Sequence, residues 1–294
     1  MLVFAVSTSL YAKEEYSAWV NQSKQGNFAL PTSQQPGPLI SFGQNIVDKG
    51  DFQLYSFFDY IRGQHKNSKE IIPYLLYGIR EDLSLLVGLP IQWLQANGNR
   101  ESGLGDLAFQ GEYVVYEKDT FTSTYQVTLV GAITAPTGSV AQVVSRSRAA
   151  ALGFGSPSFF IGVTSNYYAT DWLWWISLGG VLTTQRDGTK FGNEGWYQAG
   201  FGRNIIGKKD CCIITWMVEA TGFYDQHARI DGILDCNTGG NSITITPSLW
   251  FSTRRFIAQF GVGYVAYQHL FGQQQKNRWL VALDVGWKFN SPKP

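Results

Sequence analysis

The sequence predicts an all-β fold, a closed transmembrane antiparallel barrel of about twelve strands with short periplasmic turns and long extracellular loops. Three observations favour it: a composition rich in aromatic and poor in charged residues, a recurring two-residue alternation of apolar and polar side chains, and connections that alternate between short and long. Only closed barrels and helices satisfy every backbone polar group within lipid.

The composition separates this chain from an ordinary soluble protein. Charged residues make up only 15% of the 294 residues, against roughly 25% in soluble domains. The most apolar stretch, Trp172–Leu182, is interrupted by Ser177 and two glycines, so no run of about 18 apolar residues forms a spanning helix. The net charge of +1 argues against a nucleic-acid partner, which requires a basic patch. A secreted soluble all-β protein stays open on composition alone.

The N-terminus predicts three divisions of the chain. Residues 1–12 are mostly apolar, end in Ala12 and precede Lys13-Glu14-Glu15, as in a signal peptide. Its positive first region is missing, which favours a truncated start. Residues 13–51 have no clear period and are either a periplasmic tail or a lumen insert. Residues 52–294 form the barrel and place the protein in the bacterial outer membrane, in contact with lipid.

Period-two alternation recurs in segments close to the roughly 10 residues that a tilted membrane strand needs. The predicted strands are Phe52–Arg62, Glu70–Arg80, Asp82–Trp93, Gly105–Glu117, Phe121–Ala135, Ser156–Tyr168, Trp172–Thr183, Gly195–Ile205, Cys212–Tyr224, Asn241–Ser252, Arg255–His269 and Arg278–Phe289. Short connections such as 80–82 alternate with long ones such as 94–104, 184–194 and 225–240. A soluble sandwich has no reason to sort its loops in this way.

The alternation assigns residues to two faces. In the last strand Trp279, Val281 and Leu283 share one face, which we expect to contact lipid, while Asp284 falls on the other. A soluble barrel would reverse the two faces. The candidate lumen-lining residues are Asp59, Asp106, Glu112, Arg203, Glu219, Arg278 and Asp284. Such charges either tune which solutes pass or form a salt-bridge network that fills a narrow bore.

No pattern predicts catalytic, cofactor-binding or metal-binding residues. The three histidines fall in or beside predicted extracellular loops, without a serine at matched depth. Cys211, Cys212 and Cys236 form no disulfide framework and no zinc pattern, so we expect free thiols.

Two short motifs resemble a known family. Gly103-Leu104-Gly105-Asp106-Leu107 precedes an amphipathic strand, and Pro136-Thr137-Gly138 follows the next strand. This pattern is similar to that of bacterial outer-membrane barrels labelled as belonging to the MetA pathway of phenol degradation. From the residues alone, both motifs are also read as turn chemistry.

The resemblance implies a channel or facilitator for small molecules, hydrophobic or aromatic ones included. An outer-membrane enzyme acting on lipid, or a structural or adhesive surface barrel, are the alternatives. The expected partners are membrane lipid, an unidentified small solute and the assembly machinery that recognises an aromatic residue ending the last strand. That residue is here Phe289, which residues 290–294 follow.

Overall fold

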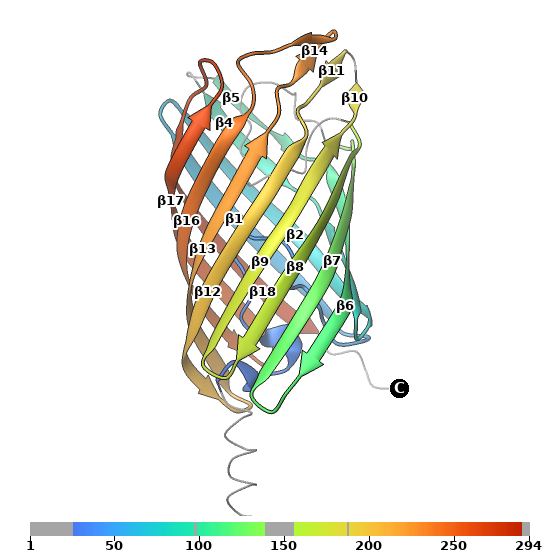
Figure 1. Ribbon diagram of the computed structural model, residues 1–294, viewed down its shortest axis with the longest axis vertical. Coiled ribbons are helices and arrows are strands. Elements are labelled where there is room, and N and C mark those ends of the chain that lie inside the picture. Colours follow the sequence, from blue (N-terminus) through green and yellow to red (C-terminus); the bar gives the residue numbers. More distant parts are fainter. Residues whose placement is uncertain (1–25, 97–98, 139–155, 187, 290–294) are drawn as a thin grey trace, which may run out of the picture.

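The computed structural model describes residues 26–96, 99–138, 156–186 and 188–289. These residues form a closed antiparallel β-barrel of 12 strands, because β1 pairs with both β18 and β2 and so joins the two edges of the sheet (Figure 1). The predicted fold class is confirmed. The barrel strands are β1 (Phe52–Gly63), β2 (Lys66–Arg80), β3 (Leu83–Gly88), β6 (Leu107–Asp119), β7 (Ser123–Ala135), β8 (Ser158–Ala169), β9 (Trp172–Thr183), β12 (Glu194–Lys208), β13 (Cys212–Asp225), β16 (Gly240–Thr253), β17 (Phe256–Leu270) and β18 (Asn277–Phe289).

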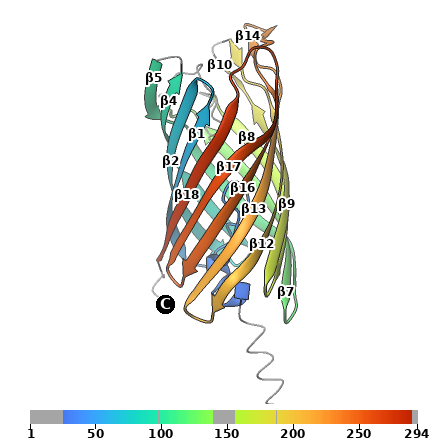
Figure 2. The ribbon, with the colours of Figure 1, turned by 90° about the vertical axis from the view of Figure 1, so that its left-hand side faces the viewer.

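Turn lengths differ between the two ends of the barrel. At the short-turn end, tight turns such as the one between Ala169 of β8 and Trp172 of β9 join neighbouring strands, and β18 ends there (Figure 2). At the long-loop end, two predicted loops carry short strands of their own. These are β10 (Gln185–Arg186), β11 (Thr189–Lys190), β14 (Arg229–Ile230) and β15 (Ile233–Leu234), which form a separate four-stranded sheet.

Two neighbouring positions in the barrel wall are interrupted. β3 stops at Gly88, and the chain resumes beyond Pro90 as β4 (Ile91–Ala96); β5 (Asn99–Leu104) and β6 are likewise separated by Gly105 and Asp106. The two halves still follow one path, because β2 pairs with β3 through one half of its length and with β4 through the other. The predicted strand 82–93 thus crosses this break, the predicted strand 105–117 begins within it, and the predicted loop 94–104 belongs to the hairpin of β4 and β5.

The two faces of the wall carry different side chains. Trp216 and Leu249 are 39% and 49% exposed on the outside, whereas Glu219 and Thr221 are fully buried towards the lumen. The apolar face of β18, with Leu283 and Trp287, also lies outside. Apolar residues therefore face outward and polar ones inward, the reverse of a soluble barrel.

Aromatic rings gather on the outer face near the short-turn end. Trp172 of β9 stacks with Phe201 of β12, which contacts Trp216 of β13 edge-on. At the seam between β1 and β18, Phe52 stacks on Phe289 with ring centroids 4.8 Å apart. Aromatic rings on the outer face near one end of a barrel are typical of a membrane interface.

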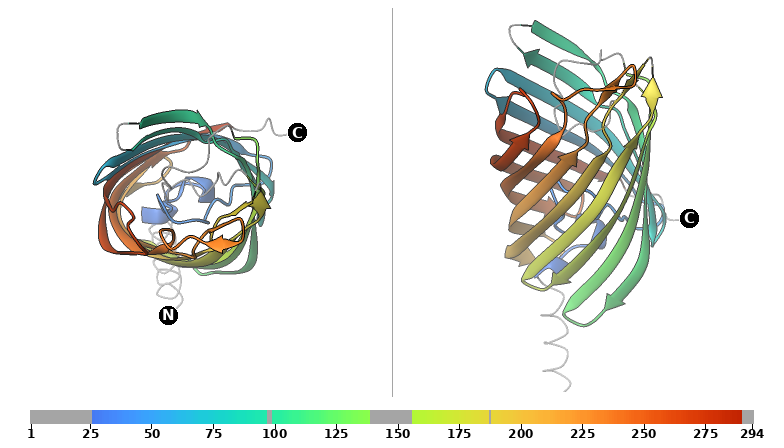
Figure 3. Two further views of the ribbon diagram at one scale, coloured as in Figure 1. Left: turned by 90° about the horizontal axis from the view of Figure 1, so that it is seen from above. Right: turned by 45° about the horizontal axis from the view of Figure 1, so that its top comes forward.

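Residues 26–51, which we call the luminal segment, lie inside the barrel (Figure 3). The segment contains two 3-10 helices, η1 (Gly26–Phe28) and η2 (Thr32–Gln34). It starts at the short-turn end, where Asn27 donates its N–H to the carbonyl of Thr170, and it returns there before β1. None of the helices within the described ranges is long and apolar enough to cross a membrane. Residues 1–25 lie outside these ranges, so the signal peptide at 1–12 stays a prediction.

The lumen is apolar at the short-turn end, which the alternation alone did not predict. Ala29, Leu30 and Val47 of the luminal segment pack against inward side chains of the wall. The inward side chains of this core are Tyr55, Leu76, Leu173, Trp175, Ile213, Met217, Trp250 and Ile257. Burial of this apolar surface fixes the segment at that end.

Candidate functional site

The luminal segment is held at mid-barrel by one carboxylate of the wall. Glu219 of β13 accepts hydrogen bonds from the backbone N–H groups of Leu39, Ile40 and Ser41 at 2.6, 3.1 and 3.0 Å, and from the Ser41 hydroxyl at 3.0 Å. The carboxylate is fully buried. Four donors aimed at one carboxylate stabilise its negative charge without a basic partner.

A second carboxylate binds the returning part of the segment. Glu112 of β6 accepts hydrogen bonds from the backbone N–H of Asn45 at 2.9 Å and from its side-chain amide at 2.6 Å. The hydroxyl of Ser84 accepts the Val47 N–H at 3.0 Å. The wall thus satisfies backbone donors that a non-helical, non-sheet segment would otherwise leave unpaired.

A buried ion pair holds the end of the luminal segment just before β1. Lys288 of β18 places its Nζ 3.0 Å from Asp48 and 2.7 Å from Asp51. The same Nζ donates to the Ser33 hydroxyl at 2.8 Å. The Lys288 side chain is only 7% exposed, so its charge depends on these partners.

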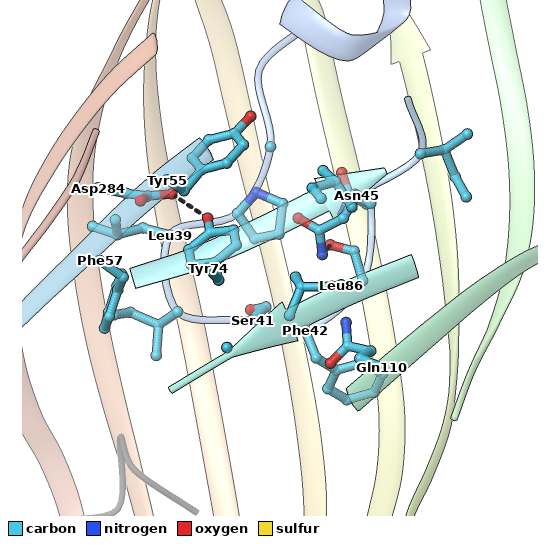
Figure 4. Close-up of a pocket in the computed structure, with 18 of the residues that line it drawn as sticks. Leu39, Ser41, Phe42, Asn45, Tyr55, Phe57, Tyr74, Leu86, Gln110 and Asp284 are labelled. Atoms are coloured by element: carbon cyan, nitrogen blue, oxygen red, sulfur yellow. Dashed lines mark hydrogen bonds between the residues drawn. The ribbon is translucent and has the colours of Figure 1, made fainter. Parts of the chain in front are cut away.

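Between the luminal segment and the wall there is a cavity of about 250 Å³ (Figure 4). Tyr55 and Tyr74 stack in parallel on its wall with ring centroids 4.8 Å apart. The Tyr74 hydroxyl donates to Oδ2 of Asp284 at 2.8 Å. Leu39 and Phe57 lie close to this pair in the view. The cavity therefore combines apolar and aromatic surface with one carboxylate.

Two further carboxylates lie opposite each other on β1 and β2. Asp59 and Glu70 are direct cross-strand partners on the lumen face, and both are buried. Gln92 donates to Glu70 at 2.6 Å. Neither oxygen of Asp59 has a hydrogen-bond partner within the described part of the chain. Like charges in this arrangement repel each other and attract positive charge.

The structure places the seven predicted lumen residues in four settings: the lumen, the long-loop end, the outer face and, for Asp106, the break in the wall. Asp59, Glu112, Glu219 and Asp284 face the lumen. Arg278 is exposed at the long-loop end, beside the register irregularity where β1 meets β18. Arg203 lies on the outer face, because odd-numbered residues of β12 point outward and its cross-strand partner is Trp216. The lumen assignment of Arg203 is therefore corrected: its long side chain can reach the interface beside the aromatic rings.

Asp106 belongs to the break in the wall, where the two sequence motifs meet. Its Oδ1 accepts the N–H of Gly138 at 3.0 Å, and the N–H of Leu107 donates to the Thr137 hydroxyl at 2.9 Å. A Cβ at Gly138 would lie 2.8 Å from the backbone of Gly105, so the close approach requires glycine. The remaining motif residues, Gly103 and Pro136, flank these contacts. The two motifs therefore hydrogen-bond the start of β6 to the residues that follow β7.

The histidines and cysteines stand apart from this lumen. His227 stacks on Phe271, which His269 contacts edge-on, at the long-loop end. Cys211, Cys212 and Cys236 are free. Within the described residues no group of three or more potential metal ligands occurs.

Several partners in the lumen were not found from the sequence. The ion pair of Lys288 was not predicted, and the backbone donors at 39–41 carry no side-chain signal. One indirect indication of these contacts is present in the sequence. A buried carboxylate such as Glu219 needs hydrogen-bond partners, and residues 13–51 show no alternation that would assign them to a strand of the wall.

No protein-family model and no curated protein matches the chain. Its fold is similar to that of an outer membrane channel from Pseudomonas putida F1, with a TM-score of 0.66 and 14% identity over 87% of this chain and 99% of that chain. The NanC porin is less similar, with a TM-score of 0.47 and 12% identity over 81% of this chain and 100% of the porin. At this identity the likeness shows a shared fold, so the phenol-degradation family stays a prediction.

The architecture defines the class of protein. A closed barrel with an apolar outer face, aromatic residues at the interface and short turns at one end is that of bacterial outer-membrane proteins. The chain is an outer-membrane β-barrel whose outer face contacts lipid.

Proposed function

We propose that the protein is a channel or facilitator for small molecules, hydrophobic or aromatic ones included, and that the luminal segment controls its opening. The observation that carries this proposal is the way the lumen is filled. Polar contacts from Glu219 and Glu112 hold the segment at mid-barrel, Lys288 holds it at the short-turn end, and a cavity of about 250 Å³ remains beside it. The likeness to an outer membrane channel and the two sequence motifs support the same function.

The luminal segment is held differently in the middle of the barrel and at the short-turn end. Apolar packing already fixes the segment at the short-turn end, whereas hydrogen bonds can exchange with water once the lumen is wet. Net contributions of such bonds are about 1–3 kcal/mol each, so breaking one or two of them at a time, rather than releasing residues 39–47 as a whole, is thermally accessible. The segment can therefore narrow the lumen without sealing it permanently.

The test compares the natural protein with a variant whose mid-barrel contacts are weakened. Purified protein and the Glu219→Gln/Glu112→Gln variant are reconstituted into planar bilayers and liposomes. We expect small, infrequent conductance steps from the natural protein, and larger or more frequent ones, with faster solute entry, from the variant. Glu81→Gln, at an exposed turn, is the matched control. An inert barrel in both forms would refute the channel.

A further inference from the structure

The cavity has two polar side-chain atoms that no described residue satisfies, Nε2 of Gln44 and Oδ1 of Asp284. Oδ2 of this carboxylate accepts the Tyr74 hydroxyl at 2.8 Å, whereas Oδ1 is buried and has no hydrogen-bond partner among the described residues. The nearest basic side chain along the strand, Lys288, is bound to Asp48 and Asp51. A buried acceptor without a donor costs free energy, which a bound donor would recover.

The surroundings of this carboxylate are apolar and aromatic. Tyr55 and Tyr74 are stacked, and Phe57 and Ile72 line the same cavity. Aromatic faces attract a cation electrostatically, and they also pack well against the flat face of a ring. Asp59 and Glu70 lie opposite each other on the same strands, further towards the long-loop end, and no basic side chain pairs with either of them in the described chain.

The size of the cavity limits its occupant. A cavity of about 150 Å³ is sufficient for benzene, and this one measures about 250 Å³. It therefore accommodates one aromatic ring with a short substituent, and it is smaller than the roughly 300–1,000 Å³ usual for drug-sized ligands.

We infer that this cavity binds a small organic cation with one ring, an arylalkyl ammonium, whose N–H donates to Oδ1 of Asp284 while its ring packs among Tyr74, Phe57 and Ile72. This inference rests on the proposed function in that it names the class of solute. Binding at this site nevertheless requires no passage through the barrel, so the two can be tested separately.

The experiment is isothermal titration calorimetry on the full chain in detergent micelles, with heats of dilution into empty micelles subtracted. The probes are benzylamine, its neutral analogue benzyl alcohol, and the anion benzoate. We expect benzylamine to bind about tenfold more tightly than benzyl alcohol, because a charged hydrogen bond is the stronger one. Benzoate should not bind, since its carboxylate would face that of Asp284.

Three variants locate the effect. Asp284→Asn should remove the preference for benzylamine and leave the affinity for benzyl alcohol within about twofold. Ile72→Trp keeps the carboxylate but fills the cavity, so it should abolish binding of both probes. Asp59→Asn is the matched control, a neighbouring lumen carboxylate outside the cavity, and should change the preference less than Asp284→Asn. The heat-modified shift of folded barrels on gels shows that each variant is assembled.

Equal affinity for the three probes would overturn the inference. So would a preference for benzylamine over benzyl alcohol that survives Asp284→Asn, or one that Asp59→Asn reduces as much as Asp284→Asn does. If Asp284→Asn does not assemble, Ile72→Trp decides, because undiminished benzylamine binding there excludes this cavity. Conductance is measured independently, so a barrel that conducts but does not bind benzylamine refutes the ligand class alone.

Discussion

Glu219 holds the luminal segment through donors rather than through an opposite charge. Three consecutive backbone N–H groups and one hydroxyl converge on its two oxygens. Glutamine has nearly the same shape, but its amide nitrogen can only donate, so in place of Oε1 it would face the N–H of Leu39.

We therefore predict that Glu219→Gln loosens residues 39–41 without unfolding the barrel. Hydrogen exchange at these amides should become about tenfold to a hundredfold faster, the range given by one or two lost charge-assisted bonds. Exchange measured by mass spectrometry on the peptides that cover this region tests it. The Glu81→Gln protein should retain the natural rates, and unchanged rates in Glu219→Gln would show that packing alone fixes the segment.

Lys288 provides the second residue-scale prediction. Replacing it by Met leaves Asp48 and Asp51 without their cation in a largely enclosed site, where breaking an ion pair costs about 3–5 kcal/mol. The exposure of Asp48, 39%, reduces this, so we expect the free energy of unfolding to fall by about 2 kcal/mol. Unfolding in guanidinium chloride measures it.

The triple variant Lys288→Met/Asp48→Asn/Asp51→Asn separates charge from packing. It removes both carboxylates together with the lysine, so most of the loss should be recovered. A triple variant as unstable as Lys288→Met would assign the loss to the missing lysine side chain instead.

At the scale of elements, the sequence predicts long strands well and interruptions poorly. Twelve alternating segments were found because each has a face in lipid and a face in the lumen. The break at Pro90 and Gly105 was missed, because the alternation of side chains continues through it and only the regular pairing of the strands is interrupted. The two-residue strands such as β10 and β14 are too short for any period to register.

The seam between β1 and β18 leads to a prediction about assembly. Phe289 ends the last strand and stacks on Phe52 of the first. Recognition of this strand by assembly machinery remains a proposal, but the stack itself stabilises closure. Phe289→Ala should lower the fraction of heat-modifiable, folded barrel in outer-membrane preparations by about half or more, because aromatic pairs contribute about 1 kcal/mol beyond their burial. Phe121→Ala, at an exposed turn, should not.

At the scale of the whole molecule, the sequence predicts which charges face the lumen but not which are neutralised there. The alternation predicts Asp59, Glu112, Glu219 and Asp284 on the inner face, and the structure has these side chains on the lumen side of the wall. The alternation could not show that backbone donors from the luminal segment satisfy Glu219, because those contacts join residues about 180 positions apart in an aperiodic stretch. Arg203 was misplaced because its charge was taken as a sign of the lumen, although the periodicity of its own strand points outward.

The balance of charge in the lumen has a consequence for selectivity. Glu219 and Glu112 are occupied by donors, and Lys288 by Asp48 and Asp51. Asp59, Glu70 and Asp284 keep oxygens without partners in the described chain. A narrow, low-dielectric lumen strengthens their field, so the open channel should favour cations over anions.

Reversal potentials in planar bilayers under a KCl gradient test this. The Glu219→Gln/Glu112→Gln variant, in which we expect the lumen to be open, should show a reversal potential of the sign for cation preference. Adding Asp59→Asn and Glu70→Gln removes two lumen charges and keeps their size, so the ratio of cation to anion permeability should fall towards one. Asp82→Asn, in an exposed ion pair with Arg80, alters a charge outside the lumen and should leave the ratio unchanged. Anion preference in the opened channel would mean that solutes follow a path that these carboxylates do not line.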